Sequence, residues 1–397
     1  MKLIKVGEKA KEFFEKNLED YLQIWEKVVN IDSGSYDVEG VKAVGSVFAE
    51  ELKKRGFDVR AEQTDPQFAP HLIAERHRPD GNKGTVVLIG HCDTVWPKGT
   101  VKDWPFSIKE GMVTGPGSGD MKGPNVMGLA ALDAIDALNI KGPEHVKFLL
   151  ISDEEVGSPS SRALIEREVR SVDCALCLEP ARKNGYLVTS RRGLATYIVD
   201  IAGVTAHAGY DFGASAVVEM AHKIIAYENL TASDFSCRVS VGVAKGGVAK
   251  QVVPESAVMH VDVRAHTMEL LEEVCRKVQE ISAKTYVSGT KTAWRGGITR
   301  PIFPRSKGVQ ELFRRAKVVA DHLKVSNFGE MSTPGGSDGS FAAALGVPTL
   351  DGLGPVGIDI CSKREVVPLH SFSERGAILT ALLAENDLVN IPKGTEE

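Results

Sequence analysis

Three short apolar segments in the first half of the chain constrain its fold more than any other feature. They are TVVLIG (85–90), VKFLLIS (146–152) and VDCALCLE (172–179), and the helically spaced segment PNVMGLAALDAIDAL (124–138) lies between the first two. Strands that alternate with helices in this way form a largely parallel sheet. The pattern therefore predicts an α/β fold, a class that places its active sites beyond the carboxyl ends of the strands.

A different order of elements begins near residue 193. The pattern over residues 193–302 predicts a strand, a helix, two strands, a helix and a strand, which is the order of a ferredoxin-like unit. Helix and strand alternate again after residue 303. We therefore expect one α/β domain formed by residues 1–192 and 303–397, interrupted by a ferredoxin-like α+β domain at 193–302.

Composition narrows the class of protein. The chain has 397 residues, of which 43% are hydrophobic and 25% charged, which is enough apolar material for two cores. The net charge of -5 and the lack of a long Lys/Arg block argue against nucleic-acid binding. Residues 1–29 have the pattern of an amphipathic helix rather than a signal peptide, and no apolar run has membrane-spanning length. We expect a cytoplasmic protein with six reduced cysteines and no membrane partner.

Two of these cysteines, Cys174 and Cys177, have the C-x-x-C spacing of some metal and redox sites. They lie in a predicted strand, where positions three apart point to opposite faces. Buried structural thiols are therefore the better interpretation.

Polar residues stand where the predicted strands end. His91 follows the first apolar segment and Asp93 comes two residues later. An imidazole that binds a metal usually donates its other ring N–H to a carboxylate, and Asp93 is well placed for this. The segment GPGSGDMKG (115–123) carries Asp120 just before a helix, but it lacks the sequence of a phosphate-binding loop. A carboxylate there suits a cation.

The segment DEEVGS (153–158) follows the second apolar segment and places Glu154 and Glu155 side by side. Glu179 ends the third, and His370 lies in VVPLHSFSE near the C-terminus. Adjacent carboxylates repel one another unless a cation neutralises them. Imidazole and carboxylate ligands without thiolate are typical of hydrolytic zinc centres.

Five motifs, taken in order, resemble the M20 family of metallopeptidases and amidohydrolases, of the glutamate carboxypeptidase (carboxypeptidase G2-like) and aminoacylase type. The motifs are GHCDTV, GPGSGDMKG, DEEVGS, LEP and LHSFSE, and the resemblance extends from about residue 70 to 385. It implies a dizinc catalytic domain of aminopeptidase-like fold with an inserted ferredoxin-like lid and dimerisation domain.

The resemblance also implies the metal ligands. Two Zn²⁺ ions per subunit would be bridged by Asp120, with His91 and Glu179 completing the shell of one ion and Glu155 and His370 that of the other. Manganese or cobalt could replace zinc in the cell.

The resemblance further implies the catalytic and substrate-binding residues. Glu154 would be the general base, and Asp93 would orient His91. In GVTAHAG, His207 matches a histidine that the partner subunit contributes to oxyanion binding, so a homodimer is expected. Substrate-binding residues are expected in three further segments: Arg264, which would hold a carboxylate, Gln251, which replaces the usual asparagine, and Gly336 in GGSDGS.

Together these residues predict a dizinc hydrolase of the amide bond to an amino acid with a free carboxylate. Carboxypeptidase and aminoacylase activities both fit, and the residues do not separate them. A non-catalytic binding protein would have lost the base or some ligands. A dimetal phosphoesterase would need basic residues that clamp a phosphate near the metals.

Overall fold

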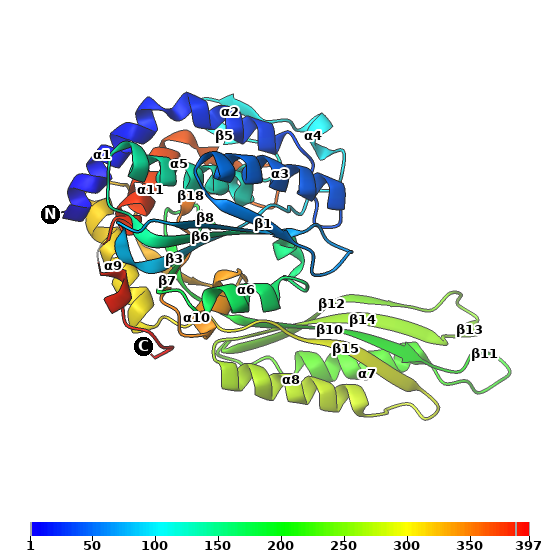
Figure 1. The fold of residues 1–397 in the computed structure, drawn as a ribbon. Coiled ribbons are helices and arrows are strands. Elements are labelled where there is room, and N and C mark those ends of the chain that lie inside the picture. The colour runs from blue at the N-terminus through cyan, green and yellow to red at the C-terminus, as the bar shows by residue number, and fades with distance from the viewer. Residues whose placement is uncertain (1, 386, 397) are drawn as a thin grey trace. The chain divides into compact units, whose positions relative to one another are not determined.

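The computed structural model describes residues 2–385 and 387–396 (Figure 1). It divides into two compact units. The large unit comprises Met1–Ser190, Phe303–Thr333 and Ser337–Glu397, and the small unit comprises Arg191–Ile302 and Pro334–Gly336. The short segment 334–336 belongs to the small unit, where Arg191 Nη1 donates to the carbonyl oxygens of Gly335 and Gly336 at 3.0 and 2.8 Å.

The large unit is built on a six-stranded mixed sheet with the order β1-β2-β6-β3-β7-β17. The strands, in that order, are Asp58–Glu62, His71–His77, Pro143–Ile151, Asn82–His91, Cys174–Cys177 and Thr349–Leu350. The last four are mutually parallel, whereas β2 runs antiparallel to its two neighbours, β6 and the edge strand β1. The α/β prediction with a mostly parallel sheet is therefore confirmed.

The register of the parallel strands aligns their carboxyl ends. Strand β3 lies between β6 and β7, with His91 opposite Ile151 and Ile89 opposite Cys177. Residues that follow these three strands therefore emerge along one edge of the sheet, as the sequence predicts.

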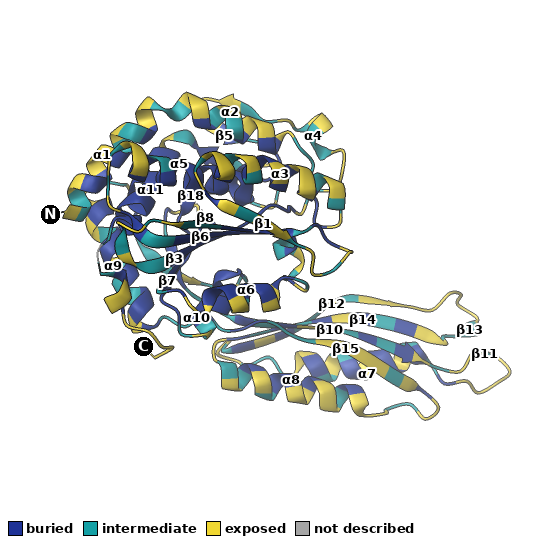
Figure 2. Ribbon diagram, in the orientation of Figure 1, coloured by how far each residue is buried: buried dark blue, intermediate teal, exposed yellow. Residues whose placement is uncertain are grey.

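Helices cover both faces of this sheet. One face packs against most of the long helices, namely α1 (Lys2–Lys16), α2 (Leu18–Val29), α3 (Val38–Lys54), α5 (Gly123–Ala137), α9 (Lys307–His322) and α11 (Leu369–Leu383). The other face packs against α6 (Arg162–Val169) and α10 (Gly339–Ala344). Alternate strand residues face the two layers, so Cys174 packs in one core and Cys177 in the other. Helix α5 is buried almost all round (Figure 2).

The N-terminal segment forms two helices, α1 and α2, which separate at Asn17, rather than the single amphipathic helix expected. The second helix carries Trp25, whose ring stacks on Phe372 of α11 with centroids 5.3 Å apart. Among the described residues, every helix is too short or too polar to span a lipid bilayer.

The small unit has a four-stranded antiparallel sheet with the order β12-β14-β10-β15. In chain order its elements are β10 (Gly193–Ala202), α7 (Ala216–Glu228), β12 (Cys237–Gly246), β14 (Ser256–Ala265), α8 (Met268–Ala283) and β15 (Lys291–Arg300). Both helices begin at side-chain caps, since Ser215 accepts from the Val218 amide and Thr267 from the Leu270 amide. The ferredoxin-like prediction is confirmed.

The remaining elements are short. They are α4 (Thr100–Asp103), β4 (Ser107–Lys109), β5 (Met112–Thr114), β8 (Pro180–Ala181), β9 (Leu187–Arg191), β11 (Ala206–His207), β13 (Val252–Val253), β16 (Glu330–Thr333), β18 (Gly354–Val356) and β19 (Val366–Pro368).

Candidate metal centre

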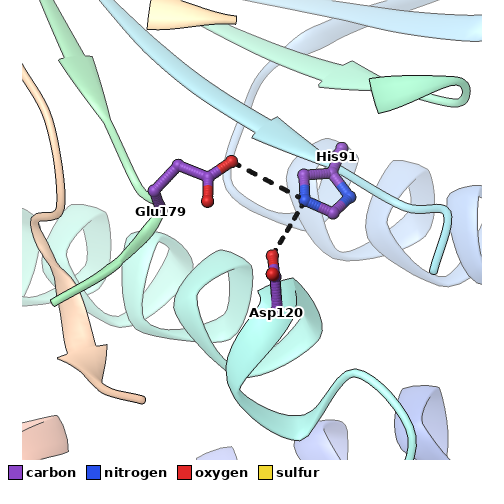
Figure 3. Close-up of side chains that lie close together, drawn as sticks. All are labelled: His91, Asp120 and Glu179. Atoms are coloured by element: carbon purple, nitrogen blue, oxygen red, sulfur yellow. Dashed lines mark hydrogen bonds and ion pairs between the residues drawn. The ribbon is translucent and has the colours of Figure 1, made fainter. Parts of the chain in front are cut away.

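A first group of ligand atoms gathers where the central strands end. His91 is the last residue of β3, Asp120 lies in the irregular segment ahead of α5, and Glu179 follows β7, and Figure 3 shows the three side chains converging. The Nε2 atom of His91 is 3.1 Å from Asp120 Oδ1 and 3.8 Å from Glu179 Oε1. All three residues are buried, and their ligand atoms lie within 4.8 Å of one another.

Asp93 contacts both the imidazole of His91 and the turn that carries Glu154 and Glu155. Its Oδ1 is 3.3 Å from His91 Nδ1, and its backbone oxygen is 2.9 Å from the same nitrogen. Its carboxylate also accepts from the backbone amides of Glu154 at 3.2 Å and Glu155 at 3.1 Å, and from the Ser35 hydroxyl at 2.7 Å. One buried carboxylate thus fixes the imidazole and the turn that carries the two glutamates.

A second group consists of Asp120, Glu155 and Cys361, whose ligand atoms also lie within 4.8 Å of one another. Glu155 belongs to a 3-10 helix at Glu154–Val156, just beyond β6. Cys361 is exposed in the loop between β18 and β19, with its Sγ 3.4 Å from Asp120 Oδ2. Asp120 is common to both groups and contributes a different oxygen to a neighbour in each.

His370, the expected fifth ligand, lies elsewhere. It is the second residue of α11, is exposed, and lines a surface hollow with Glu15, Glu110 and Met112. Among the described residues it belongs to neither ligand group, and the third member of the second group is Cys361. One signal in the sequence points to Cys361, because it lies in the polar segment DICSKRE. The structure agrees, since the other five cysteines are buried.

The charges in the centre favour a bound cation. Burial, followed by the nearby Asp120 carboxylate, raises the pKa of Glu179 and of Glu155 well above their ordinary value. Burial lowers the pKa of His91, but hydrogen bonds with Asp120 and Asp93 outweigh it and hold that pKa well above its ordinary value. Clustered carboxylates of this kind become favourable beside a dication, and the mixture of carboxylate, imidazole and thiol donors fits Zn²⁺.

The segment that carries Asp120 is held by Glu365. The Oε1 atom of Glu365 accepts from the amides of Gly119 at 2.7 Å and Asp120 at 3.3 Å, and burial raises the pKa of this carboxyl to about 7. On the other side, Lys122 Nζ donates to the Ile31 carbonyl at 2.7 Å. Neither contact was expected from the sequence.

A hollow of about 630 Å³ opens beside Glu155, which is one of its lining residues. Tyr36, Val95, Trp96 and Val156 supply an apolar lining. Tyr36 is 66% exposed, so much of its surface is free for contact. This hollow lies wholly within the large unit.

The remaining predicted residues belong to the small unit. His207 is in β11, opposite Val252 of β13, and the Gln251 carbonyl accepts from the Ala208 amide at 2.9 Å, so the structure brings His207 and Gln251 together. Arg264 lies at the far end of β14, where it pairs with Asp262 at 2.8 Å.

Gly336 lies in the 334–336 segment of the same unit. Arg264 Nη1 donates to the Pro334 carbonyl at 2.9 Å, so this segment and Arg264 are neighbours. A side chain on Gly336 would press on Arg300, because a Cβ atom there would lie 3.0 Å from Arg300 Cγ. Close packing against Arg300 therefore leaves little room for a side chain at Gly336.

The sequence model of peptidase family M20/M25/M40 matches residues 87–385, a span that contains both ligand groups. The chain belongs to this family. It is an M20 metallohydrolase, and the residues that converge at the strand ends are consistent with the metal requirement of such an enzyme.

Individual proteins are similar to this chain in sequence and in structure. Carboxypeptidase G2 from Pseudomonas sp. (strain RS-16) is 30% identical over 363 residues, covering 88% of this chain and 85% of that protein. The structure of aminopeptidase PepT from Bacillus cereus is similar with a TM-score of 0.75 at 22% identity, covering 93% of this chain and 98% of that chain. Human carnosine dipeptidase 1 is similar with a TM-score of 0.72 at 15% identity, covering 97% and 99%. These two structural matches show the shared fold.

Proposed function

We propose that this M20 enzyme hydrolyses the amide bond between an acyl group and an amino acid that keeps a free carboxylate. The observation that carries the proposal is the pair of ligand groups that share Asp120, with Glu154 next to one of the ligands. Carboxypeptidase G2, the relative at 30% identity, is a carboxypeptidase by name, which supports the same class of substrate. Carboxypeptidase and aminoacylase activities are both members of this class.

The ligand groups would hold two Zn²⁺ ions, with Mn²⁺ or Co²⁺ as alternatives. His91, Asp120 and Glu179 would hold one ion, and Asp120 and Glu155 belong to the shell of the other. Bound dications supply an activated water and polarise a carbonyl oxygen.

Glu154 takes the proton in this proposal. Its carboxylate would accept the proton of the attacking water and deliver it to the leaving nitrogen. The Asp93 carboxylate holds the Glu154 backbone amide at 3.2 Å, which fixes the turn that carries the base.

The carboxylate of the substrate would bind Arg264, whose guanidinium can hold a carboxylate in a bidentate manner. Arg264 is paired with Asp262 in the structure, so the substrate carboxylate would compete with that partner. Gln251 and Gly336 are proposed as further substrate contacts.

The positions of His207 and Arg264 support a homodimer. β11, which carries His207, pairs with β13 just before β14 begins at Ser256, whereas Arg264 is near the other end of β14. At ~3.3 Å per residue, the strand separates the two positions by about 25 Å. Two side chains this far apart in one chain cannot contact the same small substrate. A site that uses both therefore needs His207 of the partner subunit.

The test is hydrolysis by the zinc-loaded protein of N-acyl amino acids and dipeptides, each paired with its carboxamide. We expect cleavage of the free acids and a large loss with the carboxamides, because the guanidinium loses its anionic partner. Equal cleavage of the free acids and the carboxamides would show that Arg264 does not bind the substrate carboxylate. Cleavage of phosphoesters instead of amides would overturn the proposed reaction.

The acyl group is proposed to occupy the hollow beside Glu155. Its apolar lining favours an aromatic or long aliphatic acyl group. We expect Tyr36→Ala to lower kcat/KM about 10-fold for a benzoyl substrate and much less for its acetyl counterpart, because the lost contact is apolar. Tyr36→Phe is the matched control, since it keeps the ring. An equal loss for both substrates would place the acyl group elsewhere.

A further inference from the structure

We propose that Cys361 is a metal ligand, so that the second ion of this enzyme is held by Asp120, Glu155 and a thiolate. The inference rests on the proposed two-ion centre and adds a ligand that the family resemblance does not provide. A histidine is expected at this position, but His370 lies outside both groups.

The spacing of the donor atoms fits one ion. Zinc binds sulfur at ~2.3 Å and carboxylate oxygen at ~2.0–2.2 Å, so two such donors around a tetrahedral ion lie about 3.5 Å apart. The Sγ atom of Cys361 is 3.4 Å from Asp120 Oδ2. The corresponding distance in the first group, between His91 Nε2 and Asp120 Oδ1, is 3.1 Å. In each of the two groups, this pair of donor atoms is therefore spaced closely enough to bind one cation.

The loop around Cys361 is tied to the segment that carries Asp120. The Glu365 amide donates to the Ser362 carbonyl at 2.9 Å, and the Glu365 carboxylate accepts from the Asp120 amide at 3.3 Å. Cys361 itself has a φ of 56°, a conformation that non-glycine residues rarely adopt. These contacts position the thiol toward Asp120 in a fixed loop.

The other five cysteines do not compete for this role. All are buried, and among the described residues Cys361 is the one cysteine that joins carboxylates in a group able to bind a metal. Cys361 is exposed and belongs to no hydrophobic core, so its side chain is available to an ion that also contacts solvent.

A thiolate ligand has a consequence for metal choice. Sulfur favours Zn²⁺, Co²⁺ and Cd²⁺, whereas Mg²⁺ and Mn²⁺ favour oxygen. The second site should therefore keep zinc against an excess of manganese more strongly in the wild type than in Cys361→Ser.

The first experiment uses the absorption spectrum of the protein loaded with Co²⁺, together with the cobalt content per chain. A thiolate bound to Co²⁺ gives a sulfur-to-cobalt charge-transfer band in the near ultraviolet. We expect this band in the wild type and in His370→Asn, and its loss in Cys361→Ser and Cys361→His. Two cobalt ions per chain without the band, or a band that survives in both Cys361 variants, would overturn the proposal.

The second experiment needs no variant. The metal-free protein is treated with a maleimide before or after addition of Zn²⁺, and the labelled cysteine is identified by mass spectrometry. We expect Cys361 to be labelled without zinc and protected with it, and equal labelling in both samples would contradict ligation. Neither readout depends on amide hydrolysis. A protein that shows the band but cleaves no amide would retain this inference while the proposed substrate class fails.

Discussion

The two ligand groups share Asp120 but are built differently. In the first group, His91 and Glu179 come from the ends of neighbouring parallel strands and are buried. In the second, Glu155 sits on a single 3-10 turn and Cys361 on an exposed loop. Strand register fixes the first group through the sheet, whereas hydrogen bonds to Asp93 and Glu365 fix the second.

This difference predicts that the two proposed ions behave unequally. Ligands on a packed sheet edge move little, because the strands on both sides are buried in the core. Ligands on turns can move with local opening of the chain. The second ion should therefore exchange faster and leave first when a chelator is added.

The largest effect is expected from Asp120→Asn, because this residue belongs to both groups. Loss of the carboxylate that both groups share should release both proposed ions and lower kcat by at least about 10³-fold. Metal content and amide hydrolysis are the measurements. Asp133→Asn is the matched control, since Asp133 lies on α5 outside the centre and pairs with Arg55. If Asp120→Asn lost one ion only, the two groups would be independent.

Glu154→Gln and Glu155→Gln distinguish the proposed general base from the neighbouring metal ligand. We expect Glu154→Gln to lower kcat by about 10²–10⁴-fold while both ions stay bound, because only the proton acceptor is removed. Glu155→Gln should instead lose the second ion selectively. Retained turnover in Glu154→Gln would remove this residue from the role of base.

Asp93→Ala tests whether one residue supports metal binding at both ligand groups. Asp93 contacts His91 of the first group and the Glu155 amide of the second, so the affinity for both ions should fall by about 10–100-fold. Calorimetric titration with zinc measures the affinity of each ion. Ser35→Ala removes one partner of Asp93 and should have a smaller effect. A selective loss of one ion would show that Asp93 supports a single group.

The smallest effect is expected away from the centre, at Glu168 on α6. Although burial opposes it, hydrogen bonding to Lys147 and then Arg60 lowers the pKa of Glu168 from 4.5 to about 2. Its contribution to stability is present above pH ~4.5 and is lost as the pH falls toward ~2. Glu168→Gln should therefore cost about 1–2 kcal/mol at neutral pH and flatten the acid limb of denaturation. Unchanged metal content in this variant would show that stability and the centre are separable.

The sequence predicts the first group well because apolar strands end at functional residues. The segments that precede His91 and Glu179 are recognisable by their apolar runs, and parallel pairing brings their ends together. The order of elements in the small unit was equally readable, since strands and helices there have clear periodicity.

The second group was only half predictable. Glu155 follows a strand, but the loop that carries Cys361 has no periodicity, and its approach to Asp120 depends on tertiary contacts with Glu365. The family resemblance, through the motif LHSFSE, pointed to His370, nine residues away. The support of the Asp120 segment by Glu365 was invisible for the same reason, because the two are far apart in sequence.

The central claim is that two ions sharing Asp120 drive amide hydrolysis. It is tested most directly by titrating the metal-free protein with zinc while bound metal and hydrolysis of an N-acyl amino acid are measured at each addition. We predict two zinc ions per chain, bound in two steps, with full activity reached only at the second. Full activity with one ion per chain, or activity that survives complete removal of metal, would contradict the claim.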